Sequence, residues 1–478
     1  MALLHRKGTK SGVPALITAF IFILVSAASV CAEQTKSAET YQGLKLFSDV
    51  LEEIEKNYVE EVDTKELIEE AINGMVGSLD PHSSFLPPDA YKALQTETKG
   101  EFGGIGIVIT KRDGRLTVIS PIEGTPAYKA GVQAQDVIVK IEGKRTKDLK
   151  LWEAVDTMRG EAGSEVKISI YREGAPELLD FTLERAIIPM ESVRYLTLKP
   201  GYGYLWVTNF RENTAADVEE ALKDLEKENT DLKGLIVDLR DNPGGLLEQA
   251  VKVSDIFLEE GKIVSIKSRD RQETEDYSAH SGGAEHKYPV VVLINGGSAS
   301  AAEIVAGALQ DNARALILGT TSFGKGSVQT VKPLREGHAL KYTIARYYTP
   351  SGRSIQAEGI APDLVVQRRM LDKSSNKGID ANLLKEEDLE NHLKRQGKIP
   401  EKFTEPPEDS GSGEDEAGGK QKKQQTSKKE AAEKLMRLRD AVYKHSDSDP
   451  RALLLDSQIN RAYELLHGFQ IFQGLSRN

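Results

Sequence analysis

The chain has 478 residues, of which 39% are hydrophobic and 29% are charged. This length and apolar content suffice for more than one hydrophobic core and predict roughly two to four domains. The formal net charge is -11, and Lys and Arg are spread along the chain, so a nucleic acid or another polyanion is disfavoured as a partner.

The first residues form a targeting segment. Basic side chains crowd the first ten positions, and an apolar run follows from Val13 to Val30. This order is typical of a secretory signal peptide spanning residues 1–32, and the small residue Ala32 predicts cleavage before Glu33. The chain is therefore expected to be exported and to act in the periplasm or elsewhere in the cell envelope.

Two other fates of this segment are open. The apolar run is close to the length that spans a bilayer, so it could be kept as a membrane anchor. Cys31, the only cysteine, could carry a lipid, although Val30 fits poorly beside a lipidated cysteine. If cleavage follows Ala32, the mature chain has no cysteine, which excludes a thiolate nucleophile and a cysteine-bound metal.

Residues 33–99 are expected to form a helical N-terminal module. Apolar residues recur near helical spacing from Leu44 to Ile54 and again from Leu67 to Met75. The module is either a small packed unit or the arm of a dimer. Because apolar stripes occur near both ends of the chain, we expect a homodimer or a larger assembly.

Short strands and glycine turns follow over residues 100–185. Phe102–Ile107 leads into a strand, Leu116–Ile119 and Asp136–Ile141 form others, and a helix is predicted over Leu149–Met158. This order closely resembles a PDZ domain, in which free backbone N–H groups of a glycine loop bind a peptide's terminal carboxylate. The resemblance assigns that role to Gly103, Gly104, Ile105, Gly106 and Ile107. A glycine-rich turn without a ligand is the alternative.

The largest apolar block spans residues 186–370. Strands are predicted over Tyr202–Val207, Gly234–Leu239, Ile263–Ile266 and Val290–Ile294, with helices over Thr214–Glu226, Leu246–Phe257 and Ala299–Leu309. Alternating strands and helices indicate an α/β layered domain with buried strands. Residues 371–430 are polar and are expected to be a linker. Residues 431–478 return to a helical pattern.

One serine lies where a buried strand passes into a helix. The segment Asn295–Glu303 reads Asn-Gly-Gly-Ser-Ala-Ser-Ala-Ala-Glu. A serine at a helix N-terminus lies beside free backbone N–H groups and the positive end of the helix dipole. Those donors are what the oxyanion of an attacked carbonyl requires. The plain alternative is a helix cap, because serine is a preferred residue there.

Two further segments favour the catalytic interpretation. Asp238–Gly245 ends a strand with adjacent glycines, and Ser322–Gln329 places a lysine between two glycines. Together with the serine segment, these motifs resemble the carboxyl-terminal processing peptidases (tail-specific proteases), which are PDZ-containing serine peptidases with a Ser-Lys-Gln catalytic set. The resemblance runs from the N-terminal helices to about Arg369. It implies a multidomain α+β fold with a crotonase/ClpP-like α/β peptidase core.

The same resemblance assigns roles to individual residues. Ser300 would be the nucleophile, Lys325 the general base and Gln329 the group that holds the amine in line. The oxyanion hole would use the backbone N–H of Ala301 and one from Gly244 or Gly245. Ser298 is a competing nucleophile or a helix cap, and Arg159 is a candidate contact between the PDZ domain and the core.

The implied function is an ATP-independent endopeptidase that acts on proteins or peptides with accessible C-termini. No cofactor is expected, and an activating adaptor protein is a candidate partner. For a lysine base, burial should lower the pKa, with Glu303 and Asp311 as the carboxylates to examine.

Other assignments are less well supported. A histidine base would have to come from His280, His286 or His338, which lie in loops, or from His82 in the N-terminal module. The sequence has no Gly-x-Ser-x-Gly elbow around Ser300 and no HExxH motif, so a metal is not indicated. The rival functions are an inactive PDZ scaffold and a crotonase-like acyl-CoA enzyme, which would have no need of a PDZ insertion.

Overall fold

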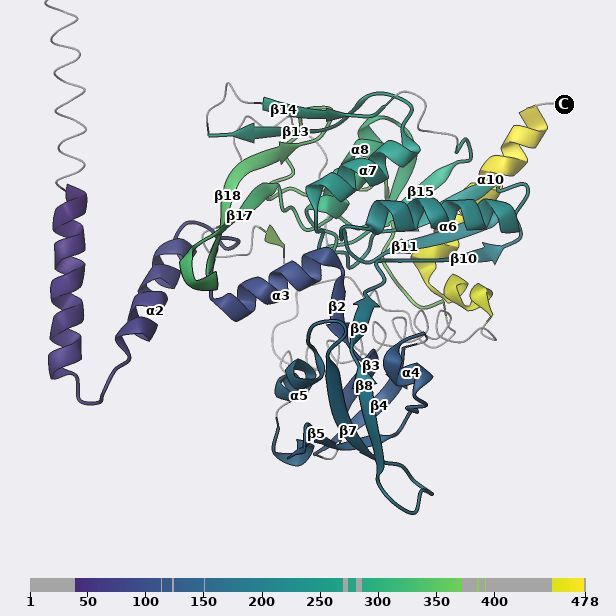
Figure 1. Cartoon of the computed structure of the whole chain (residues 1–478). Coiled ribbons are helices and arrows are strands. Elements are labelled where there is room, and N and C mark those ends of the chain that lie inside the picture. Colours follow the sequence, from purple (N-terminus) through teal and green to yellow (C-terminus); the bar gives the residue numbers. More distant parts are fainter. Residues whose placement is uncertain are drawn as a thin grey trace, which may run out of the picture. The chain divides into compact units, whose positions relative to one another are not determined.

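A computed structural model describes most of the chain, in two compact units that divide after Met75 (Figure 1). The described residues are 39–112, 114–122, 124–149, 151–269, 274–280, 286–371, 385, 386, 392 and 449–476. The predicted signal peptide, nearly all of the predicted linker and the start of the predicted C-terminal region lie outside them. Within the described ranges, none of the helices is long and apolar enough to cross a membrane.

In the first unit, residues 39–57 are helical, and α2 (Thr64–Gly77) begins after Asp63. The Asp63 carboxylate accepts the backbone N–H of Lys65 at 2.8 Å, which satisfies a donor at the helix start. The predicted apolar stripe is present in the first helix but is exposed, with Leu44 64% exposed. We predicted that a second copy of the chain packs against this stripe, and that stays a prediction.

The PDZ sheet has the order β3-β4-β5-β7-β8 and is antiparallel, with β6 paired to β5. Its strands are β3 (Ile107–Arg112), β4 (Arg115–Pro121), β5 (Val137–Ile141), β6 (Lys144–Arg145), β7 (Glu165–Tyr171) and β8 (Leu179–Glu184). Helices α4 (Pro126–Lys129), η1 (Thr146–Asp148) and α5 (Leu151–Met158) complete it. β2 (Glu101–Gly104) and β9 (Ala186–Pro189) pair where the chain enters and leaves. β3 is an edge strand.

The largest domain is built on a mostly parallel sheet of order β10-β11-β12-β15-β16-β19. Its strands are β10 (Val193–Lys199), β11 (Tyr202–Val207), β12 (Gly234–Asp238), β15 (Val290–Ile294), β16 (Ala315–Gly319) and β19 (Leu364–Val365). Only β10 pairs antiparallel. β11, β12 and β15 are buried along their whole length, which explains their continuous apolar sequences.

Helices cover both faces of this sheet (Figure 1). One face packs against α6 (Thr214–Glu228), α7 (Leu247–Phe257) and α8 (Ala301–Asp311). The other face packs against η4 (Pro450–Leu455) and α10 (Ser457–Ser476), through Leu453, Ile459 and Leu466. Most of the C-terminal apolar stripe therefore packs against the chain's own sheet. Phe472, which follows the stripe in sequence, is exposed.

A second, antiparallel sheet lies beside α8 and corrects two expectations. It contains β1 (Ser84–Leu86), β18 (Ala339–Tyr348), β13 (Lys262–Ser268), β14 (Thr274–Ser278) and β17 (Ser327–Pro333), with η2 (Arg335–Gly337) between β17 and β18. Ile263–Ile266 is a strand, but of this sheet and not of the parallel one. β1 interrupts the expected helical module, and α3 (Pro88–Lys99) follows it. A three-residue strand is too short to show periodicity, and its partner lies far along the chain.

Candidate active site

Ser300 is the N-cap of α8 and lies six residues after the end of the buried strand β15. Its backbone has φ 53° and ψ −113°, a conformation that is costly for a residue with a side chain. The residue is 6% exposed, and its backbone N–H donates to Glu303 Oε2 at 2.8 Å. A strained serine at the start of a buried helix presents its hydroxyl beside free helix N–H groups.

Glu303 connects the serine turn to the lysine loop. Its fully buried carboxylate accepts from the backbone N–H of Ser300, Gly324 and Lys325 and from the Ser322 hydroxyl, at 2.6 to 2.9 Å. Burial raises the pKa of Glu303 to about 7, and these four hydrogen bonds limit the rise. This anchoring role was not predicted, although Ser followed three residues later by Glu is the sequence signature of a capping box.

Lys325 lies in the loop between β16 and β17 and is partly buried. Burial lowers the pKa of Lys325, and the positive charge of Lys341 lowers it further, while Glu386, Glu303 and Asp80 oppose the shift. The direction agrees with the expectation for a lysine base.

Asp311, named from the sequence as a carboxylate to examine near the lysine, belongs elsewhere. Its oxygens bind the backbone N–H of Ser351 and the guanidinium of Arg353. That part of the expectation was wrong, because Asp311 is the last residue of α8 and lies at the opposite end of the helix from Ser300.

Gln329 lies on β17 but is not bonded to the lysine. Its amide nitrogen donates to Ser327 Oγ at 2.9 Å and contacts Thr343 Oγ1 at 3.3 Å. Within the described residues, no direct hydrogen bond joins Lys325 to Ser300 or to Gln329. The structure therefore brings the serine and lysine segments together through Glu303 and leaves the predicted glutamine contact unmade.

The two glycines after β12 differ in what their N–H groups do. A Cβ on Gly244 (φ +103°) would lie 2.8 Å from Ser300 Cβ and 3.0 Å from Ala301 N, so this turn touches the serine directly. The N–H of Gly244 donates to Asn242 Oδ1 at 2.9 Å. Among described residues, the N–H groups of Gly245 and Ala301 have no acceptor, which leaves both available to an oxyanion.

Ser298 has a structural role in the same turn. Its fully buried hydroxyl donates to Leu239 O at 2.8 Å and accepts the N–H of Asn295 at 3.0 Å. Both functions of the hydroxyl are therefore occupied. The prediction that Ser298 caps the helix was wrong, because Ser300 is the N-cap.

Tyr347, on β18, was not predicted as a site residue. Burial raises the pKa of its phenol to about 12, and a side-chain hydrogen bond with Ser300 counteracts part of that rise. Its backbone N–H donates to Gly326 O at 2.7 Å, one residue after Lys325. Tyr347 thus contacts both halves of the site, and alternation along β18 is the only local signal of its inward position.

The four histidines considered as alternative bases have carboxylate or aromatic partners. His280 is 86% exposed and pairs with Asp255, and His286 pairs with Glu226. His338 stacks on Phe85. His82 lies two residues before β1, and its side chain is mostly buried. Its Nε2 lies 2.7 Å from Glu386 Oε2.

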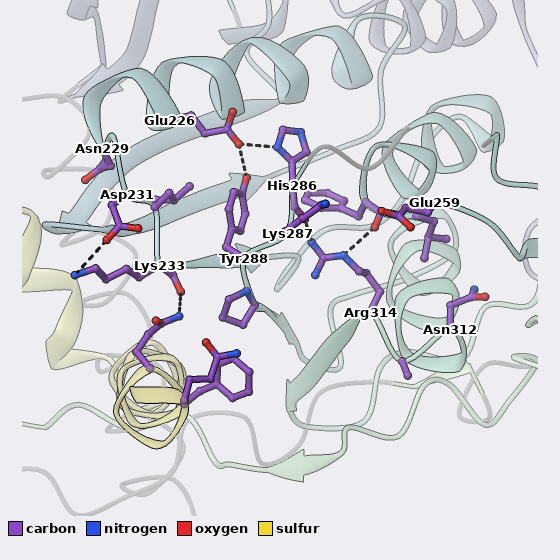
Figure 2. A pocket seen from close by; sticks show the side chains of 18 of the residues that line it. Glu226, Asn229, Asp231, Lys233, Glu259, His286, Lys287, Tyr288, Asn312 and Arg314 are labelled. Atoms are coloured by element: carbon purple, nitrogen blue, oxygen red, sulfur yellow. Dashed lines mark hydrogen bonds and ion pairs between the residues drawn. The ribbon is translucent and has the colours of Figure 1, made fainter. Parts of the chain in front are cut away.

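A cavity of about 1230 Å³ lies at the amino ends of the parallel strands, whereas Ser300 follows the carboxyl end of β15 (Figure 2). The residues that line the cavity precede β12, β15 and β16. There Glu226 accepts from Tyr288 and lies 2.6 Å from His286 (Figure 2). These groups are already paired and are distant from Ser300 along the strands. Over the described residues, His, Cys, Asp and Glu form no group suited to hold a metal ion.

The glycine loop expected to bind a terminal carboxylate contains fewer residues than predicted. Gly103 and Gly104 belong to β2 and pair with β9, so they are not part of a free loop. Ile105 and Gly106 form the loop before β3, and in the described chain neither donates its backbone N–H. A Cβ on Gly106 (φ +75°) would lie 2.3 Å from Thr125, so only glycine fits there.

Arg159 follows α5, and its guanidinium lies 4.6 Å above the ring of Phe102 on β2. This contact is within the PDZ domain, next to the strand pair through which the chain passes to the core. Coupling through Arg159 stays a prediction.

Three features together define a PDZ-containing serine peptidase. They are a strained serine at a helix start, a lysine loop anchored by the same carboxylate, and a PDZ domain. The model for peptidase family S41 matches residues 201–366, the PDZ domain model matches residues 103–183, and the model for the activating protease CtpB N-terminal domain matches residues 23–90.

The chain is 48% identical over 374 residues to the carboxy-terminal-processing protease of Bartonella bacilliformis, covering 78% of this chain and 85% of that protein. It is 38% identical to the carboxy-terminal processing protease CtpA of Bacillus subtilis over 314 residues, or 66% of each. Among solved structures, the photosystem II D1 C-terminal processing protease is 33% identical, with 67% of this chain and 92% of that chain covered and a TM-score of 0.39. The chain belongs to the S41 carboxyl-terminal processing peptidases and is a serine-type endopeptidase.

Proposed function

We propose that this peptidase is exported, works without ATP and cuts through an acyl-enzyme on Ser300, with Lys325 as the general base. The observation that supports this most is the position of Glu303, which accepts the backbone N–H of both residues. A common anchor fixes the spacing of nucleophile and base. The lowered pKa of Lys325 suits a group that must be neutral to accept a proton.

In the proposed reaction, Ser300 Oγ attacks the scissile carbonyl carbon and passes its proton to the neutral amine of Lys325. The N–H groups of Ala301 and Gly245 donate to the oxyanion that forms. Collapse of this intermediate breaks the C–N bond, and Lys325 protonates the leaving amine. Water then attacks the ester carbon, gives a proton to Lys325 and releases the new carboxyl terminus, and the proton returns to Ser300.

Gln329 would assist once its side chain turns. Its amide now binds Ser327 and Thr343 on the same sheet. Rotation towards Lys325 when substrate binds would place a neutral acceptor beside the amine. A neutral amide can orient the amine without the charge that would raise its pKa.

The PDZ domain is proposed to bind the C-terminal tail of the substrate. The free N–H groups of Ile105 and Gly106 suit a terminal carboxylate, and the adjacent strand β3 has an open edge for the peptide backbone. The names of the curated relatives describe carboxy-terminal processing, in agreement with recognition of this end.

Amidating the C-terminus of a substrate should therefore slow its cleavage, mainly through a higher KM, because an amide lacks the anionic oxygen that the loop binds. Deletion of residues 100–185 should remove the preference for the acid. The measurement is a comparison of kcat/KM for one peptide in acid and amide forms, with Ser300→Ala enzyme as the blank. Equal rates for both forms with the intact enzyme would contradict the PDZ assignment.

Export is proposed from the basic start and the apolar run before Ala32. The mature protein recovered from the cell envelope should then begin at Glu33, which N-terminal sequencing or intact mass can determine. A chain that begins at a lipid-modified Cys31, or that keeps the apolar run, would instead place the enzyme on a membrane.

A further inference from the structure

Glu386 lies beyond the segment matched by the S41 model, yet it is buried in the core beside the lysine loop. Its carboxylate oxygens lie 2.7 and 2.9 Å from His82 Nε2, and one of them accepts from Gln356 Nε2 at 2.8 Å. Its backbone N–H donates to Phe323 O at 3.1 Å. The side chain has no exposed surface and two protein partners, His82 and Gln356.

These contacts reach the lysine loop from both sides. Phe323 stands two residues before Lys325. Gly326 follows the lysine, and its N–H donates to Gln356 Oε1 at 3.0 Å, while the other end of the Gln356 amide binds Glu386. The backbone of Gly326 packs tightly against the backbone of Gln356, because a Cβ on Gly326 would lie 2.4 Å from Gln356 N.

His82 completes the arrangement from a distant part of the sequence. It stands between Asp80 and Ser83, and Asp80 accepts the His82 N–H and the Ser83 hydroxyl at 2.9 and 2.8 Å. Ser83 Oγ in turn accepts the N–H of Thr343 on β18. The imidazole is therefore held by the core sheet and presents Nε2 to the carboxylate.

Resting on the Ser300–Lys325 mechanism proposed above, we infer that Glu386 is a positioning residue for the general base. Held between His82 and Gln356, its carboxylate fixes the loop after Lys325 through Gln356, while its backbone N–H holds Phe323 before the lysine. Together with burial and the other charges around the amine, the negative charge of Glu386 determines the pH range over which Lys325 can accept a proton.

The charges that face Lys325 come from four parts of the fold. Lys341 on β18 disfavours the ammonium form, whereas Glu386, Glu303 on α8 and Asp80 before β1 favour it. Burial prevails, so the pKa of Lys325 is lowered overall. Loss of the Glu386 charge alone should lower that pKa further, because a negative charge that favours the ammonium form disappears while the other three residues stay in place.

Glu386→Gln is the informative substitution, since the amide keeps the size and an oxygen for Gln356 but removes the charge. We expect the rising limb of kcat/KM against pH to move down by about one pH unit, with the plateau changed less than about threefold. Well below the midpoint, the variant should be up to about tenfold faster than the parent enzyme. Glu386→Ala, which also loses the contact with Gln356 but keeps the backbone hydrogen bond to Phe323, should lower kcat at every pH.

Asp255→Asn is the matched control, because it removes the carboxylate of another His–carboxylate pair, at an exposed site away from Ser300. Its pH profile should equal that of the parent enzyme. The substrate throughout is one fluorogenic peptide with a free C-terminus, and thermal unfolding of each variant establishes that it is folded.

Two results would overturn the inference. The first is an unchanged pH profile in folded Glu386→Gln enzyme, and the second is a loss of activity at all pH values in that variant, which would make the carboxylate chemically essential. Lys325→Ala separates this inference from the mechanism on which it rests. An active Lys325→Ala enzyme refutes the lysine base itself, whereas an inactive one with an unchanged Glu386→Gln profile refutes only the role of Glu386.

Discussion

Lys325→Ala should abolish turnover as completely as Ser300→Ala, by roughly 10⁴- to 10⁶-fold, because a nucleophile and its base act as one unit. Lys325→Arg should also fail, since a guanidinium stays protonated at any pH at which the enzyme is folded. Lys325→His should keep at most a trace. Steady-state cleavage of one peptide by the parent enzyme and these four variants measures the effects, with Asp255→Asn as an active control.

The pH dependence of the parent enzyme tests the same assignment. Only the neutral amine can take the proton of Ser300, so activity should rise with pH as Lys325 loses its proton. Because burial lowers its pKa, this rise should begin below the range in which an ordinary lysine titrates, about 10.4. Activity in Lys325→Ala enzyme would refute the dyad. His82 would then be the first alternative base, ahead of His280, His286 and His338.

Asp456→Ala should destabilise the protein by about 3–5 kcal/mol, because it leaves two buried guanidinium groups without their shared partner. Arg240 is fully buried and donates to Asp456 Oδ2 at 2.9 Å and to Asp238 Oδ2 at 2.7 Å. Arg368 donates to the same Asp456 oxygen at 2.9 Å. Urea denaturation of the parent and variant proteins measures the loss.

This contribution should also depend on pH in a defined direction. Although burial alone would raise it, the pKa of Asp456 is lowered overall by Arg240 and Arg368. Its stabilising effect is therefore present at neutral pH and is lost as the pH falls from about 4 through the folded-state value. Asp231→Ala, which breaks an exposed pair with Lys233, should leave the denaturation midpoint nearly unchanged. Equal midpoints for the parent and Asp456→Ala proteins would contradict the argument.

Patterns local in sequence predicted much of this fold. The continuous apolar runs of β11, β12 and β15 indicated buried strands, and the structure shows that these strands are parallel. The confirmed family membership agrees with the motifs around Ser300 and Lys325. The PDZ strands were likewise recognisable from alternation and glycine turns. In each case the signal lies within a few consecutive residues.

What the sequence could not predict depends on contacts between distant residues. Glu303 and Tyr347 have only weak local signals, capping-box spacing and strand alternation, and neither signal shows that these residues lie beside Ser300 or Lys325. His82 was assigned to a helical module, yet it belongs to the core because β1 pairs with β18. Glu386 was placed in a polar linker, since nothing in its neighbourhood shows that its carboxylate is buried.

The pairing of β1 with β18 also bears on when the enzyme can become active during synthesis. The ribosome produces Ser84–Leu86 early, then the whole PDZ domain and most of the core before the partner strand emerges. α10, which covers the second face of the parallel sheet, is made later than all of the strands described. Folds closed by such remote segments form slowly. A nascent chain that already carries Ser300 and Lys325 is therefore expected to be harmless to its surroundings until α10 has been added.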